Sequence, residues 1–232
     1  GILLAAQGEN CLYLIDYSGN LVRKIGELGN GPNQFQKPTG CTYHNGYYYV
    51  IDSGNKRIVI LDRQFNYTKE LKLPKSEREP EKEFTDIAIN DKGDIYISGS
   101  YLYDSGLYRY NLGKEKFENV QKYFYGSLKE FDGEVYAVDQ FRIYVDFEKK
   151  EITGGAGPNA LWRLDGRNIK KLSNLPAGLN AGSFELLRDN LIICSPFHSA
   201  VMVFNMKNGN IRINSELKDY VVYNNVKPEV NL

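Results

Sequence analysis

Residues 47–62 read YYYVIDSGNKRIVILD, and this stretch decides the fold. Two runs of aromatic and β-branched residues, YYYVID and RIVILD, flank the polar turn SGNK, which is the sequence signature of a β-hairpin. Another such run, Pro38 to His44, precedes it and ends in the turn Asn45-Gly46, and Tyr67 to Leu73 follows it. The segment therefore predicts a sheet of four antiparallel strands.

The same order of turn and strand recurs along the chain. Equivalent strands are about 40 residues apart, which is the period of the four-stranded blades of a β-propeller. The weaker copies are Asp94 to Ser98 with Leu107 to Tyr110, Glu134 to Asp139, and Leu191 to Ser195 with Ala200 to Phe204. The sequence thus predicts an all-β propeller of four-stranded antiparallel blades.

The two ends of the chain fit the same scheme. Ile2 to Ala6, Cys11 to Asp16 and Leu21 to Gly26 are typical of the second, third and fourth strands of a blade that lacks its innermost strand. Tyr220 to Tyr223 is a candidate for that strand, and its addition would close the ring and remove two open sheet edges. A C-terminal strand is therefore expected to join the N-terminal blade.

The blade count has one ambiguity. We count five blades, but the stretch from Phe141 to Ala160 is longer than the repeat allows and is either an insertion or a degenerate sixth blade. No linker divides the chain, so we expect a single β-propeller domain over residues 1–232.

A known repeat family shares the motif. Residues 25–40, IGELGNGPNQFQKPTG, followed by YVIDSGNKRI at residues 49–58, closely resemble the NHL-repeat consensus, and the match is specific over Leu21 to Asp62. The chain also resembles the secreted six-bladed NHL-type propellers of gut bacteria, from which it differs in having five countable blades. The resemblance implies an exported bacterial protein, located in the periplasm, outside the cell or at its surface.

The motif also has a physical interpretation. Gly29 and Gly31 allow backbone conformations closed to other residues where the chain crosses between blades, and Pro32 stiffens that crossing. Asp52 and Arg57 face each other across the SGNK turn. Because buried charges are usually paired, we expect these two residues to hold the repeat together rather than to bind a ligand.

Composition excludes some partners. The chain has 29 Lys plus Arg and 29 Asp plus Glu, so its net charge predicts no field for a polyanion, and nucleic acid is an unlikely partner. RNA binding, known for NHL propellers with a basic face, is the least favoured hypothesis. No run approaches the ~20 apolar residues of a membrane span. Gly1 stands where a Met would begin a chain, as if a leader had been removed.

Few residues suit catalysis or metal binding. With only His44 and His198, a multi-histidine zinc centre or a Ser-His-Asp triad is not expected. The glycine-rich residues 154–159 predict a loop, and Cys11, Cys41 and Cys194 are expected to be buried free thiols. No cofactor is expected, with calcium the one possibility left open. Its oxygen ligands would come from turn residues: Asn45, Asn90, Asp132, Asn180 and Asp189.

The function is expected on one end of the blades, which we call the loop face. It carries the loops between second and third strands and the crossings from the outermost strand to the next blade. Binding residues concentrate on loops that a rigid scaffold holds, and aromatic rings beside Arg and Asp suit a peptide or a glycan. The candidate ligand-binding residues are Gln34, Phe35, Tyr101, Tyr103, Asp104, Phe141, Arg142, Phe197 and His198.

Two function classes remain open. The favoured hypothesis is a non-catalytic propeller that binds a protein, peptide or carbohydrate through this face. The alternative is a calcium-dependent lactonase or esterase, or a lyase, acting at the central channel. Tightly bound divalent metal on the axis would discriminate between them, because fold alone does not decide function.

Overall fold

The computed structural model describes residues 1–75, 83–100, 105–122, 124, 126–139, 142–146, 151–156, 160–174, 183–195, 200–205, 207–208 and 210–214. Its regular structure is β-sheet, apart from two single turns of 3₁₀ helix, η1 (Gln7–Glu9) and η2 (Leu112–Lys114). Five sheets form the blades of a β-propeller, as the sequence predicts.

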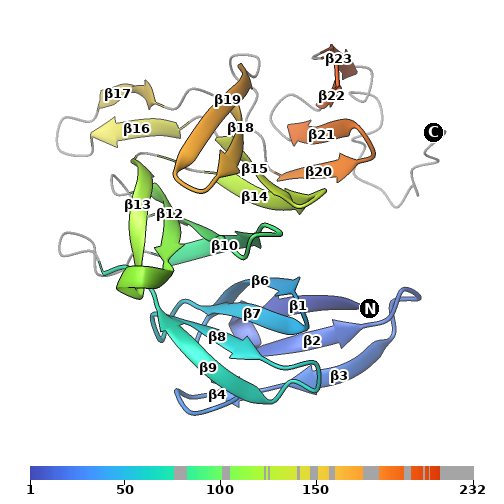
Figure 1. The fold of residues 1–232 in the computed structure, drawn as a ribbon, viewed down its shortest axis with the longest axis vertical. Helices are drawn as coiled ribbons and strands as arrows, with labels where there is room; N and C mark the ends of the chain where they lie inside the picture. The colour runs from blue at the N-terminus through green and yellow to red at the C-terminus, as the bar shows by residue number, and fades with distance from the viewer. Residues whose placement is uncertain are drawn as a thin grey trace. The chain divides into compact units, whose positions relative to one another are not determined.

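Blade 1 has three strands and blade 2 has four, each paired antiparallel with the next (Figure 1). Blade 1 contains β1 (Ile2–Ala6), β2 (Cys11–Ile15) and β3 (Leu21–Ile25). Blade 2 contains β6 (Pro38–His44), β7 (Tyr47–Asp52), β8 (Arg57–Leu61) and β9 (Tyr67–Lys72). The crossing between them carries a short parallel pair, β4 (Glu27–Leu28) and β5 (Gln34–Phe35).

The other three blades have four strands each. Blade 3 contains β10 (Glu83–Ile89), β11 (Ile95–Ser100), β12 (Gly106–Asn111) and β13 (Lys116–Lys122). Blade 4 contains β14 (Gly126–Phe131), β15 (Glu134–Asp139), β18 (Ala160–Asp165) and β19 (Asn168–Asn174). Blade 5 contains β20 (Ser183–Leu187), β21 (Asn190–Ser195), β22 (Ala200–Asn205) and β23 (Ile211–Asn214).

The ambiguous stretch after blade 4's second strand is an insertion. In blade 4, β15 neighbours β18, and between them in sequence lies a separate hairpin of β16 (Arg142–Asp146) and β17 (Glu151–Ala156). The described residues of this stretch therefore form a hairpin inserted into blade 4 and no sixth blade. The expected loop at residues 154–159 is wrong for Gly154, Gly155 and Ala156, which pair with β16 as the end of β17.

The chain divides into two compact units, residues 1–137 with 162–170, and residues 138–161 with 171–232. A single domain over residues 1–232 stays a prediction. The strand expected to close the ring, Tyr220 to Tyr223, lies outside the described residues.

The core of the first unit lies between successive blades. Alternate side chains of a strand point to opposite faces of its sheet, so each inner blade contributes to two clusters. Blade 2 shows this most clearly: in β8, Val59 and Leu61 pack toward blade 1, whereas Ile58 and Ile60 pack toward blade 3. Every residue of β8 is therefore buried. A third cluster, around Tyr96 and Leu128, joins blades 3 and 4.

Candidate functional site

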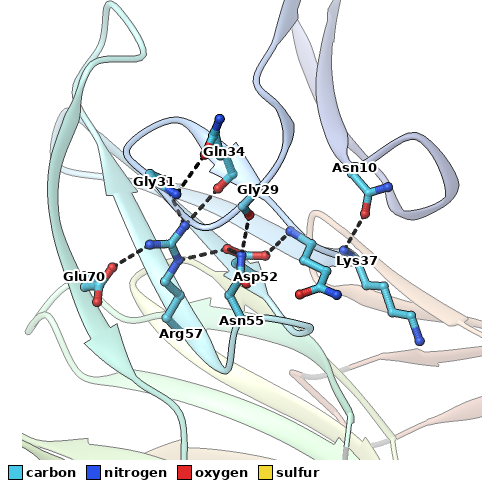
Figure 2. Close-up of polar contacts among 10 residues, drawn as sticks. Asn10, Gly29, Gly31, Gln34, Lys37, Asp52, Asn55, Arg57 and Glu70 are labelled. Atoms are coloured by element: carbon cyan, nitrogen blue, oxygen red, sulfur yellow. Dashed lines mark hydrogen bonds and ion pairs between the residues drawn. The ribbon is translucent and has the colours of Figure 1, made fainter.

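The loop-face end of blade 2 is a self-contained polar cluster, the Asp52–Arg57 hub (Figure 2). The Arg57 guanidinium donates to Asp52 Oδ2 at 2.9 Å and to Glu70 Oε2 at 2.8 Å. Its Nη2 also donates to the carbonyl oxygens of Gly31 and Gln34, at 3.0 and 2.9 Å. Burial would lower the pKa of Arg57, but the hydrogen bonds with the two carboxylates outweigh it and raise the pKa.

The acidic partner of the hub is fully enclosed. Asp52 has no exposed surface and accepts from the backbone N–H of Gln36 at 2.6 Å and from Asn55 Nδ2 at 2.8 Å. Asn55 also donates to the carbonyl of Gly29. The predicted structural pairing of Asp52 with Arg57 is thus confirmed. It ties the crossing from blade 1 to the third strand of blade 2.

Gln34 and Phe35 belong to this crossing. Gln34 Oε1 accepts from the N–H of Gly31, and its Nε2 donates to Glu27. Phe35 has no exposed surface and packs in the core between blades 1 and 2, so its predicted place on a binding surface is wrong. Gly29 has a φ of +155°, a backbone conformation that other residues rarely adopt, which explains glycine at this position.

Most of the other predicted binding residues cannot be placed. Tyr101, Tyr103, Asp104, Phe141, Phe197 and His198 lie outside the described residues, and Arg142 begins β16 without a described side chain. Their shared location on the loop face stays a prediction.

The loop-face end of blade 3 differs in kind from that of blade 2. The last paired residues of β11 and β12 are Gly99 and Gly106, where β7 and β8 end in Asp52 and Arg57. Two serines stand beside these glycines. Ser98 and Ser105 are 2% and 3% exposed, and neither hydroxyl has a hydrogen-bond partner among the described residues.

Ser98 and Ser105 are candidate site residues that the sequence analysis did not identify. They flank residues 101–104, which carry three of the predicted binding residues. A buried hydroxyl without a partner costs about 1–3 kcal/mol, so native structures keep few of them. The only sequence signal was their position at the ends of strands that border the loop.

A second cluster lies on the innermost strands of blades 2 to 4. Asp86 on β10 accepts from its neighbour's N–H, that of Ile87, and from the N–H of Leu128 on β14, at 2.9 and 2.8 Å. Burial raises the pKa of Asp86 to about 6, although these two hydrogen bonds and Lys129 oppose the shift. Burial and the Asp86 carboxylate together raise the pKa of the Cys41 thiol to about 11.

Two of the three cysteines have described side chains, and both are free thiols. Cys11 is a buried free thiol, as predicted, whereas Cys41 is free but only partly buried. Cys194 has no described side chain. No group of three or more His, Cys, Asp or Glu side chains that could hold a metal occurs within the described ranges.

The turn residues considered as calcium ligands have local partners or turn geometry. Asn90 accepts from the N–H of Asp94 and Asp189 pairs with Lys207 at 2.8 Å, while Asn45 and Asp132 have positive φ angles of 47° and 51° in tight turns. Asn180 is not described. No helix in the described ranges is long and apolar enough to cross a membrane.

Comparison with known proteins identifies the fold but no family. No family model matches the chain, and no curated protein does. Virginiamycin B lyase from Staphylococcus aureus matches with a TM-score of 0.61 and 13% identity, over 91% of this chain and 65% of that one. A Bacteroides fragilis protein described as exported matches with a TM-score of 0.61 and 13% identity, over 91% of this chain and 67% of that one.

A third match is the extracellular domain of a protein described as a two-component system in B. thetaiotaomicron. Its TM-score is 0.60 at 9% identity, over 91% of this chain and 27% of that one. The chain spans less than two thirds of the lyase's length. At these identities the likeness shows the β-propeller fold and says nothing of ligand or reaction.

Proposed function

We propose that this chain is an exported, NHL-type binding propeller that recognises a peptide, protein or glycan through the loop face of blade 3. The observation that carries the proposal is the pair of buried hydroxyls of Ser98 and Ser105, which have no hydrogen-bond partner among the described residues. Exported and extracellular proteins among its structural neighbours support the proposed location.

The chemistry of this end suits a polar ligand. A hydroxyl donates one hydrogen bond and accepts two, so a ligand that displaces the atoms covering the two serines would find partners for sugar hydroxyls or peptide amides. Tyr101 and Tyr103 add rings for stacking, and Asp104 adds an acceptor. Blade 3 has Gly99 and Gly106 where blade 2 has Asp52 and Arg57, so the described residues at this end of blade 3 form no hub like that of blade 2.

The test is a screen on glycan and peptide arrays. The wild-type chain should bind at least one class of probe, and the Tyr101→Ala/Tyr103→Ala variant should lose about tenfold or more in affinity. Tyr17→Ala is the matched control, because Tyr17 is 87% exposed but lies in the β2–β3 turn, at the opposite end of the strands. Equal losses in both variants, or no bound probe, would refute the proposal.

The alternative, a calcium-dependent lactonase or esterase, or a lyase, is favoured by one observation. Asp86 lies on an innermost strand, and a carboxyl with a pKa of about 6 suits proton transfer near neutral pH. Calcium that survives dialysis in stoichiometric amount, together with ester or lactone hydrolysis that Asp86→Asn abolishes, would establish the alternative instead.

A further inference from the structure

A groove of about 580 Å³ runs along the outer edge of blade 3. One wall consists of five consecutive residues of β13, Lys116 to Val120, and the other wall is Arg167 from the β18–β19 turn of blade 4. Five consecutive lining residues mean that the strand's main chain, and not only alternate side chains, borders the groove. The groove lies on the side of the blade, away from the loop face.

The edge of β13 is open to pairing. β13 is the last strand of its sheet, in the order β10-β11-β12-β13, and its hydrogen-bonded neighbour is β12 alone among the described strands (Figure 1). An edge strand presents unpaired N–H and C=O groups, to which an extended peptide can add as another strand. The pairing of β13 with β12 is regular from Lys116 to Asn119 and shifts register after it. The regular part of the edge is therefore short.

The groove also has an excess of positive charge. Glu118 Oε1 accepts from Lys114 at 2.7 Å and Glu118 Oε2 accepts from Arg167 at 2.9 Å, so one carboxylate serves two cations. Hydrogen bonds from Lys114 and Asn111, with Arg167, hold the pKa of Glu118 down to about 2. Lys116 adds a further cation with no ion-pair partner among the described residues.

We propose that the groove binds an extended acidic segment of a partner protein, which pairs with the edge of β13 and places a carboxylate between Lys116 and Arg167. This inference goes beyond the proposed function, because it assigns a second surface with its own ligand chemistry. Main-chain pairing supplies affinity that is largely independent of sequence, and the two lining cations, Lys116 and Arg167, select acidic side chains. Glu118 occupies part of the same electrostatic site and competes with the incoming carboxylate.

The proposal is tested with a fluorescein-labelled octapeptide of alternating Glu and Val, measured by fluorescence anisotropy. A matched peptide with alternating Lys and Val tests charge, and an acidic peptide with N-methyl groups on alternate amides tests strand pairing. Only the unmethylated acidic peptide should bind, and its affinity should fall as salt rises. Equal binding of the N-methylated peptide, or no binding of the acidic one, would overturn the proposal.

Charge variants test where the acidic peptide binds, and they should change its affinity in both directions. Lys116→Glu and Arg167→Glu should each weaken the acidic peptide about tenfold or more, whereas Glu118→Gln should strengthen it by removing the competing carboxylate. Lys69→Glu is the control, since Lys69 is exposed on β9, the outermost strand of blade 2. A Lys69→Glu effect as large as that of Lys116→Glu, or weaker binding by Glu118→Gln, would contradict the assignment.

Two further measurements separate the outcomes. A heparin octasaccharide that binds through Lys116 and Arg167 while the acidic peptide does not would identify a polyanion surface and overturn the peptide assignment. The Tyr101→Ala/Tyr103→Ala variant should bind the acidic peptide like the wild type. Failure of the groove therefore leaves the loop-face proposal standing, and the reverse holds as well.

Discussion

Blades 2 and 3 share one strand order but end differently on the loop face. β7 and β8 close on Asp52 opposite Arg57 across a four-residue turn, and both charged side chains are hydrogen-bonded within the chain. β11 and β12 close on Gly99 opposite Gly106, with the hydroxyls of Ser98 and Ser105 left without partners among the described residues.

The difference suggests a structural role for the loop-face end of blade 2 and a binding role for that of blade 3. Blade 2 uses its strongest sequence motif to fasten the crossing from blade 1, so the side chains of Asp52 and Arg57 are engaged within the chain. In blade 3, an arginine–aspartate pair lies elsewhere: Arg109 on β12 meets Asp94 near the opposite end of the strands. Its loop-face end therefore keeps polar groups that a ligand can satisfy.

Removing the cation from the blade 2 hub should have the largest effect. Arg57→Ala leaves the carboxylate of Asp52 buried without its cation and frees two backbone carbonyls, so we expect a loss of about 3–5 kcal/mol in the free energy of unfolding. Urea denaturation measures the loss.

The control is the Arg109–Asp94 ion pair of blade 3. Arg109→Ala removes a partner from Asp94, whose side chain is 15% exposed, and should cost about 1 kcal/mol. If the two variants lose the same stability, the hub has no special role and the contrast between the blades fails.

A side chain at the end of blade 3 should be costly for steric reasons. A Cβ on Gly99 would lie 2.6 Å from the ring of Phe84, which is fully buried, so Gly99→Ala should destabilise by about 2–3 kcal/mol. Gly8→Ala meets nothing within 4 Å and should change stability by less than about 0.5 kcal/mol. A neutral Gly99→Ala would show that steric crowding does not require glycine at this position.

Asp86 is a half-buried carboxyl that accepts hydrogen bonds from backbone N–H groups, whereas Asp52 is paired with an arginine. Its folded-state pKa of about 6 lies above the ordinary value of 3.8, so the folded chain holds a proton that the unfolded chain has released between those pH values. The free energy of unfolding should therefore fall as pH rises from 4 to 6. We expect the fall to be on the order of 2 kcal/mol.

Asp86→Asn should remove this pH dependence, as measured by urea denaturation at several pH values. Asp62→Asn should remove a pH dependence of the opposite sign. Hydrogen bonds from Asn66 lower the pKa of Asp62, so the stability that Asp62 contributes is lost as pH falls. An unchanged pH profile in Asp86→Asn would contradict the assigned shift.

The serines should have the smallest effect on stability. Because neither hydroxyl has a partner among the described residues, Ser98→Ala and Ser105→Ala should each change the free energy of unfolding by less than about 1 kcal/mol, with stabilisation the expected sign. Denaturation in urea measures this. A loss above about 2 kcal/mol would reveal an internal hydrogen bond and remove the basis of the proposed site.

Much of the fold could be predicted because local pattern and pairing agree. β1, β6, β7 and β15 have the predicted bounds, since alternating apolar residues and turn residues such as Asn45-Gly46 determine strands locally. The β16–β17 hairpin was not predicted, because its glycines are typical of loops, and strand pairing with a neighbour overrides that preference.

The candidate site was less predictable. Aromatic residues near turns were taken as surface groups, but burial depends on neighbours distant in sequence, and Phe35 packs into the core between two blades. Asp86 carries no local signal, and the only signal for Ser98 is its position at the end of a strand that borders the loop. Their environments are created by adjacent strands and blades, so only the three-dimensional arrangement reveals the unpartnered hydroxyl or the raised pKa.

The most direct test of this account is the affinity of a Ser98→Ala/Ser105→Ala variant for the ligand found on the arrays, measured beside its free energy of unfolding. We expect affinity to fall about tenfold or more while stability is kept or raised, because the hydroxyls act on the ligand and not on the fold. Unchanged affinity, or a loss of affinity that only follows a loss of stability, would contradict it.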